Sequence, residues 1–211
     1  HSTIATGALP YRHGMVLKAW WDRAAARSRP CTSDSSEKNI AYNGTVTGGE
    51  SADLLLVPPL GEQVQAAGGQ TVAMSLNPGS AITIAGKNPT AVVWFNDRAG
   101  WTTSTAFTET PIEWLKAYFD ANPFASDRGK VWNLLLPPAS YRGEDDAPGE
   151  RRHSGWTSVF PHELGAPPEQ FNTHWQRSPF ADEYLGRLAA EVREHARRAQ
   201  RLRCARRHCA R

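Results

Sequence analysis

Two short apolar runs constrain the fold most strongly, because a buried strand requires other elements to cover it. They are Thr71–Leu76 (TVAMSL) and Ala91–Phe95 (AVVWF). Compact apolar runs of this length are typical of buried strands. The turn residues Asn96–Gly100 follow the second run, so we expect Trp101–Thr105 to return beside it as the other arm of a hairpin.

Helical and irregular segments alternate around these runs. His1–Gly7 is typical of the last turns of a helix that ends at its glycine, whereas the Pro and Gly of Leu9–Gly14 indicate a loop. Arg27–Glu50 is polar and rich in Ser, Asn, Thr and Gly, which favours an irregular surface segment. The Pro58-Pro59 pair then opens a short helix that stops at Gly68-Gly69.

The clearest helical pattern spans Pro111–Asn122. Thr110 and Glu113 form a capping box, and Pro111 occupies the first helical position. The apolar face of this helix consists of Ile112, Leu115 and Phe119.

The last third of the chain combines a long loop with a final helix. Pro137–Pro168 carries many Pro, Gly and charged residues, so we expect a loop there. The final helix starts at Ser178-Pro179, and Asp182 and Glu183 complement its positive end. Its apolar stripe consists of Leu185, Leu188, Ala189 and Val192. Because strands alternate with helices, the fold class is α/β or α+β.

The charge of the chain is divided unevenly along its length. Residues 193–211 hold eight Arg and one Glu, a balance of +7, while the whole chain carries +3, so the preceding residues carry −4. A basic tail of this kind could neutralise nucleic-acid phosphates. It lacks interleaved aromatic residues, so we expect no sequence-specific nucleic-acid recognition.

Short motifs supply no catalytic constellation. Gly86-Lys87 lacks the spacing of a phosphate-binding loop, and His162-Glu163 lacks the second His of a zinc-protease motif. Thr47–Ser51 is typical of a flexible turn. Asn43–Thr45 fits a glycosylation acceptor. No run is apolar over the length of a membrane span, and no signal-peptide pattern is present.

Metal ligation finds little support in the spacing of His, Cys and acidic residues. Glu191 and His195 lie four residues apart, which favours an exposed ion pair over a shared metal ligand. Cys204, His208 and Cys209 match no common zinc spacing. Together with Cys31, the cysteines are too few for a disulfide scaffold.

Four long stretches resemble bacterial alkaline phosphatase superfamily proteins, in the branch of phosphate-irrepressible phosphatases and type I phosphodiesterase/nucleotide pyrophosphatases. They are His1–Arg23, Val72–Phe107, Tyr141–Gly165 and Trp175–Ala189. The resemblance implies an α/β fold, as an incomplete portion of an α/β/α sandwich with an inserted cap-like region. It covers residues 1–192 as a partial domain, and the Arg-rich residues 193–211 resemble nothing in the family.

The resemblance implies zinc-dependent hydrolysis of phosphate monoesters or diesters. In such enzymes two zinc ions flank a threonine nucleophile, which forms a phospho-threonine intermediate. The family's nucleophile and first-strand zinc ligand precede the position of His1, and its later zinc ligands follow that of Val192. We therefore expect this chain to be inactive and to bind no zinc. The family also implies a periplasmic or secreted location and a small phosphate ester as partner.

The resemblance places three residues of this chain at the family's phosphate-contacting positions, each with a different residue type, so none of the family's catalytic residues is intact. Lys18 occupies the slot of an Asn, while Asn77 and Gly79 occupy the slots of a Lys and an Arg. Lys18 could donate a hydrogen bond to phosphate as a point charge. Alternatively, its presence could mean that this position no longer serves catalysis. The loss of two cations at Asn77 and Gly79 favours diesters, whose phosphate carries one less charge.

The alternative to an enzyme is a non-catalytic protein. The abrupt change at Arg193 is typical of a frameshifted reading of a GC-rich gene, which would give a non-catalytic truncated product that at most binds polyanions through its tail. A partial domain would leave apolar faces uncovered. We therefore expect poor solubility or a molten state.

Overall fold

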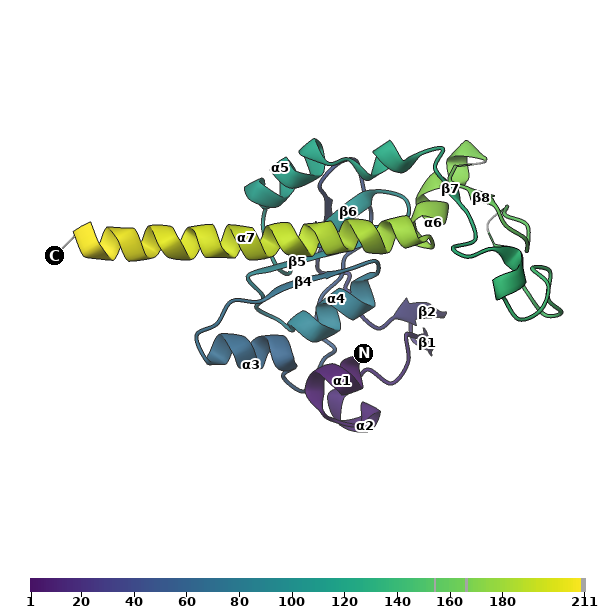
Figure 1. The fold of residues 1–211 in the computed structure, drawn as a ribbon. Helices are drawn as coiled ribbons and strands as arrows, with labels where there is room; N and C mark the ends of the chain where they lie inside the picture. Colours follow the sequence, from purple (N-terminus) through teal and green to yellow (C-terminus); the bar gives the residue numbers. More distant parts are fainter. Residues whose placement is uncertain (154, 166, 210–211) are drawn as a thin grey trace.

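The computed structural model describes residues 1–153, 155–165 and 167–209, with residues 168 and 202–209 described by their backbone alone. A four-stranded sheet lies at its centre (Figure 1). The strands follow the order β3 (Asn39–Ala41), β6 (Gly100–Ser104), β5 (Ala91–Asn96) and β4 (Val72–Ser75). β4 runs parallel to β5, whereas β6 is antiparallel to both β5 and β3. Both expected strands and their hairpin are therefore confirmed.

The hairpin turn follows directly from its side chains. Asn96 Oδ1 accepts hydrogen bonds from the backbone N–H groups of Arg98 and Ala99, at 2.9 and 3.2 Å. Gly100 adopts φ 75°, a left-handed conformation that glycine reaches without a steric penalty. These features reverse the chain, and Trp94 then pairs with Thr102 across the two strands.

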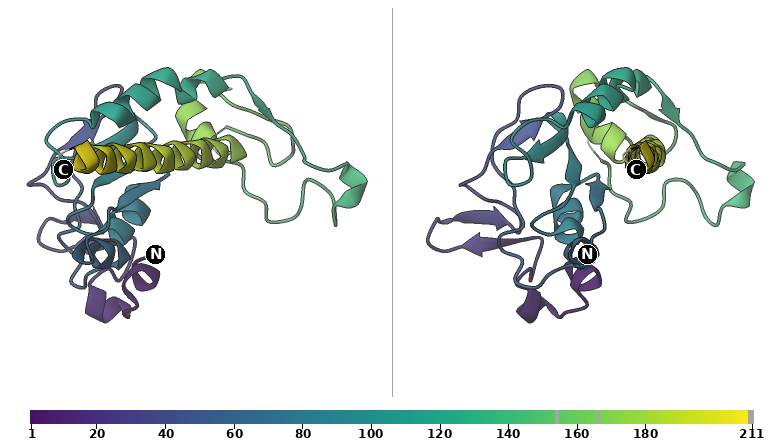
Figure 2. Two further views of the ribbon diagram at one scale, coloured as in Figure 1. Left: turned by 60° about the vertical axis from the view of Figure 1, so that its left-hand side comes forward. Right: turned by 90° about the vertical axis from the view of Figure 1, so that its left-hand side faces the viewer.

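Helices cover both faces of the sheet, which gives three α/β/α layers. One face carries α5 (Glu113–Ala121), α6 (Phe171–Gln176) and α7 (Pro179–Cys209). The right-hand view of Figure 2 shows α7 end on, beside the sheet. The other face carries α4 (Pro78–Ala85), which packs in turn on α1 (Ser2–Thr6) and α3 (Leu60–Ala66). The expected α/β class is confirmed.

Alternation along β5 explains the layers. Ala91, Val93 and Phe95 join the cluster beneath α5, α6 and α7. Val92 and Trp94 join the cluster on α4, with Ala81, Ile82 and Ala85. Successive side chains of a strand point to opposite faces, so a strand with five successive apolar residues, Ala91–Phe95, must be covered on both.

Smaller elements complete the chain. Helix α2 spans Pro10–His13, β1 (Ala19–Asp22) pairs with β2 (Arg27–Pro30), and β7 (Val131–Trp132) pairs with β8 (His162–Glu163). Short 3-10 helices occupy Phe124–Asp127, Pro138–Ser140 and Pro168–Gln170. Much of the expected loop around Pro138–Ser140 extends away from the rest of the molecule (Figure 2).

Some local expectations are wrong. Leu9–Gly14 is not a simple loop, because Pro10 starts the single-turn helix α2 and Gly14 ends it. Arg27–Glu50 contains β2 and β3 among its irregular parts. The Thr110–Glu113 capping box does not form: Ile112 is extended, so α5 begins at Glu113 with no side-chain cap. The short helix after Pro59 is confirmed as α3.

The buried stripe of α7 differs slightly from the expected one. Leu188 is buried, and Leu185 and Val192 pack against the same cluster, but Ala189 is exposed. Ala181 and Tyr184 are buried in its place, because they lie seven and four residues before Leu188 on the same helical face. None of the described helices combines the length and the apolar character that a bilayer crossing requires.

Trp101 joins the sheet to two helices. Its ring stacks on Phe119 of α5, with centroids 5.2 Å apart and planes at 3°, and on Tyr184 of α7, with centroids 5.6 Å apart. It also meets Phe95 edge to face at 5.7 Å. Aromatic pairs of this kind stabilise a core beyond the area that they bury.

We expect Trp101→Ala to lower the free energy of unfolding by about 3–5 kcal/mol, because it leaves a large cavity between three elements. Urea unfolding followed by far-UV circular dichroism measures this change. Trp21→Ala is the control, since Trp21 is 64% exposed, and it should alter stability by less than about 0.5 kcal/mol. A gradual loss of signal without a transition in the parent chain would instead support the molten state expected from the sequence.

Candidate functional site

A pocket of about 390 Å³ lies where α1, α2, the segment before β1 and the first turn of α4 meet. Figure 1 shows these elements gathered below the sheet, near the first residue of the chain. The lining residues are His1, Ser2, Thr3, Pro10, His13, Met15, Val16, Leu17, Lys18, Cys31, Asn77, Gly79 and Thr83.

The pocket brings together the three positions singled out in the sequence. Lys18, Asn77 and Gly79 all line it, although Lys18 is far from the other two along the chain. Lys18 lies on the connection from α2 to β1, and its carbonyl accepts a hydrogen bond from Cys31 N–H at 3.0 Å. Asn77 and Gly79 lie at the start of α4, directly after β4.

Asn77 fixes the first turn of α4. Its Oδ1 accepts hydrogen bonds from Ser80 N–H at 3.0 Å and from Ser80 Oγ at 2.9 Å. The cap orients the helix so that its N-terminal end lines the pocket, and this end carries the positive pole of the helix dipole. An anionic group is therefore favoured over a cation at this wall of the pocket.

Thr3 and His13 form a hydroxyl–imidazole pair, but its geometry does not activate the hydroxyl. Thr3 Oγ1 lies 3.1 Å from His13 Nε2, and His13 Nδ1 accepts the N–H of Met15 at 3.1 Å. A ring nitrogen that accepts an N–H carries no proton, so the proton resides on Nε2 and is donated to Thr3. His13 is buried and ties α1 to α2; in this tautomer it cannot take the Thr3 proton.

Cys31 and His1 complete the polar lining. Burial, reinforced by the charge of Glu50, raises the pKa of the Cys31 thiol, which favours the thiol over the nucleophilic thiolate. His1 Nδ1 lies 2.9 Å from Ser80 Oγ, which donates to Asn77, so His1 is joined to the cap of α4. Sequence reasoning missed these contacts, because they join residues from distant segments.

The start of α4 leaves room in the pocket. A Cβ built on Gly79 would meet no atom closer than 3.8 Å, and those nearest atoms are Asn77 Oδ1 and Cys31 Sγ. Gly79 therefore leaves space in the pocket, and its backbone conformation does not require a glycine.

The described residues contain no group of three His, Cys, Asp or Glu side chains able to hold a metal ion. They do not fit a pair of zinc ions, so we place no zinc site among them. Glu191 and His195 do not pair: Glu191 contacts Arg198, and the His195 ring stacks on Trp114 at 4.3 Å. The side chains of Cys204, His208 and Cys209 lie outside the described residues.

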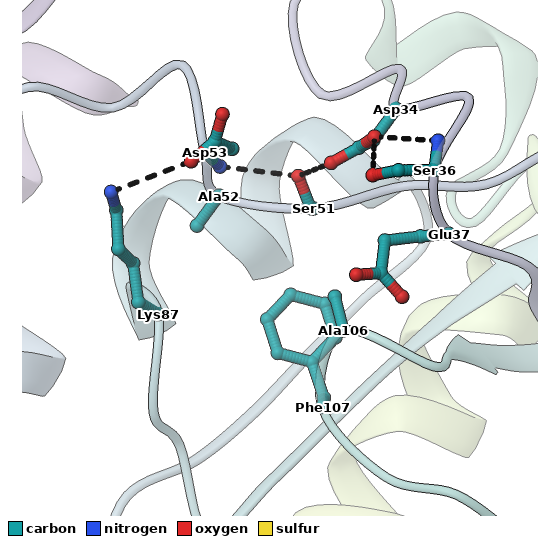
Figure 3. Close-up of a pocket in the computed structure, with 9 residues that line it drawn as sticks. All are labelled: Asp34, Ser36, Glu37, Ser51, Ala52, Asp53, Lys87, Ala106 and Phe107. Carbon is teal, nitrogen blue, oxygen red and sulfur yellow. Dashed lines mark hydrogen bonds and ion pairs between the residues drawn. The ribbon is translucent and has the colours of Figure 1, made fainter.

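Figure 3 shows a second pocket, whose lining includes acidic side chains that interact with neighbouring lining residues. Asp34 Oδ1 accepts Ser36 Oγ and Oδ2 accepts Ser51 Oγ, both at 2.6 Å, and these hydrogen bonds lower the Asp34 pKa. Lys87 lies 3.7 Å from Asp53 Oδ1. The Thr47–Ser51 turn is therefore anchored at Ser51, and the acidic groups already have partners.

Comparisons with known proteins agree with this architecture. Residues 1–144 match the family described as type I phosphodiesterase / nucleotide pyrophosphatase. The chain is 32% identical over 145 residues to alkaline phosphatase PafA of Elizabethkingia meningoseptica and 27% identical over 175 residues to alkaline phosphatase PhoV of Synechococcus elongatus. These matches cover 67% and 77% of this chain but only 27% and 30% of the two relatives.

The structural match extends further along the chain. The crystal structure of wild-type alkaline phosphatase PafA superposes with a TM-score of 0.68 at 28% identity. The match covers 85% of this chain and 35% of that one. The fold is therefore a partial portion of the fold of that phosphatase.

We expect Asn77→Ala to lower the free energy of unfolding by about 1 kcal/mol, because α4 loses its N-terminal cap. Asn77→Asp should cost much less, since Asp is an equally good cap. Thermal or urea unfolding compares the two variants. An equal loss in both would show that Asn77 does not stabilise α4 through its Oδ1.

Proposed function

This chain belongs to the type I phosphodiesterase / nucleotide pyrophosphatase family, and on that basis we propose that its pocket between α2 and α4 binds the phosphate group of a phosphate ester. The reaction that we assign to the parent protein is phosphate-ester hydrolysis. The observation that carries the proposal is the convergence of Lys18, Asn77 and Gly79 on one pocket.

The electrostatics of the pocket support an anionic ligand of low charge. Lys18 supplies an exposed ammonium group, and the capped end of α4 adds the partial positive charge of a helix N-terminus. Asn77 and Gly79 supply no cation. The balance favours a phosphodiester, which carries one negative charge, over a monoester dianion.

The chemical step is assigned to residues beyond those described here. The resemblance implies a threonine nucleophile and two zinc ions, and the described residues offer neither an activated hydroxyl at Thr3 nor a metal cage. The role that we propose for this chain is to supply the phosphate-side wall of the site, so that on its own it does not turn over esters. A periplasmic or secreted location follows from the same family resemblance.

The boundary at residue 192 also remains a proposal. We treat residues 1–192 as the partial phosphatase domain and residues 193–211 as a separate Arg-rich tail. In the structure α7 runs through this boundary without a break.

We expect Lys18→Gln to weaken the binding of inorganic phosphate about tenfold, because a charge-assisted hydrogen bond contributes roughly 1.5 kcal/mol. Titration of the full chain followed by NMR measures the affinity. Lys38→Gln is the matched control, since Lys38 is also exposed and lies outside the pocket. Equal weakening by the two substitutions would contradict the assignment of this pocket.

Adding a cation at Gly79 tests the preference for diesters. Gly79→Arg should raise the affinity for phenyl phosphate relative to diphenyl phosphate by about fivefold, because the added charge attracts a dianion more strongly than a monoanion. Gly186→Arg makes the same change on an open part of α7, where a Cβ meets no atom within 4 Å. A ratio that stays constant, or that rises equally in both variants, would refute the role of position 79.

A further inference from the structure

Helix α7 continues past the packed part of the molecule. The His195 ring stacks on Trp114, which lies in the first turn of α5. Figure 1 shows the C-terminal part of the helix extending beyond the sheet and α3. From Ala196 to Cys209 the helix adds about 21 Å, at 1.5 Å per residue. This length is available to a partner without any rearrangement of the core.

The extension is basic along its whole length. Residues 196–211 contain seven Arg and no Asp or Glu. At its base Arg197 lies 4.0 Å from Glu194, and Arg198 contacts Glu191. Beyond these pairs no acidic residue follows in the sequence, so the positive charge increases toward the end of the helix.

The arginines are distributed around the helix rather than along one face. At 100° per residue, positions 197, 198, 201, 203, 206 and 207 fall on all sides of the axis. An interfacial membrane helix requires a broad apolar face opposite its charges. The extension has no such face, which disfavours a lipid surface as its partner.

We infer that the extension of α7 binds the major groove of duplex DNA without sequence specificity. A helix with its side chains is about 10–12 Å across, and the B-form major groove is about 12 Å wide, with phosphates along both walls. Because the arginine positions fall on all sides of the helix axis, phosphates of both walls can be neutralised at once. The major groove of A-form RNA is too narrow to admit such a helix.

The net charge of the remaining chain favours an approach of DNA from the far end of α7. Residues 1–192 carry a net charge of −4, which repels a polyanion. The helix points away from that acidic part, so DNA can approach its far end while it stays clear of the body. This surface is separate from the pocket that lines the start of α4.

The test is fluorescence anisotropy of a labelled 20-base-pair DNA duplex with the full chain, repeated over a series of salt concentrations. We expect binding to weaken steeply with salt. Arg197→Gln with Arg201→Gln should lower the magnitude of the log–log salt slope by about 2, because each phosphate that is no longer neutralised removes about 0.9 from the slope. Gln retains helix propensity, and far-UV circular dichroism confirms that α7 is intact.

The matched control is Arg151→Gln with Arg152→Gln, which removes the same charge from an exposed loop. It should leave the slope unchanged. An equal effect of both double variants would overturn the inference, because binding would then depend on net charge alone. Equal affinity of the parent chain for an RNA duplex of the same length, or for vesicles of anionic lipid, would also overturn it.

Discussion

The two-sided burial of β5 is the constraint on which the rest of the structure depends. Its residues alternate between the aromatic cluster under α5, α6 and α7 and the smaller cluster on α4. Five successive apolar residues, Ala91–Phe95, require a layer of helices on each face of the sheet. The parallel pairing of β4 with β5 then fixes where β4 ends, and α4 starts shortly afterwards at Pro78. In open α/β sheets, ligands bind beyond the carboxyl ends of parallel strands, and the pocket at Asn77 follows this rule.

Sequence reasoning succeeded where one physical signal was strong and local. The strands at Val72 and Ala91 and the hairpin to Trp101 follow from apolar runs and turn residues. It failed where the residue pattern was weak or was equally typical of another structure. Helix α4 was missed because Pro78 and Gly79 resemble a turn, and β-branched residues fill much of the rest. The capping box at Thr110 was wrong because Ile112 stays extended and delays the helix start.

The candidate site shows the same limit more clearly. The resemblance identified Lys18, Asn77 and Gly79 one by one, but only the folded chain places them around one pocket. The orientation of His13 was also inaccessible to sequence, because it depends on the Met15 N–H that its Nδ1 accepts. That hydrogen bond decides the chemistry: it turns a hydroxyl–imidazole pair into a structural contact. Phosphate binding in this pocket is therefore the proposed role of these residues, and the tautomer of His13 gives no support to catalysis at Thr3.

Phosphate binding in this pocket is tested most directly by a ¹H–¹⁵N NMR titration of the full chain with inorganic phosphate. If phosphate binds in the pocket at α4, the amide signals of Lys18, Asn77 and Gly79 shift together along one binding curve, while those of the acidic pocket around Asp34 stay in place. Shifts confined to the arginines of α7, or an absence of any shift near Gly79, would contradict it.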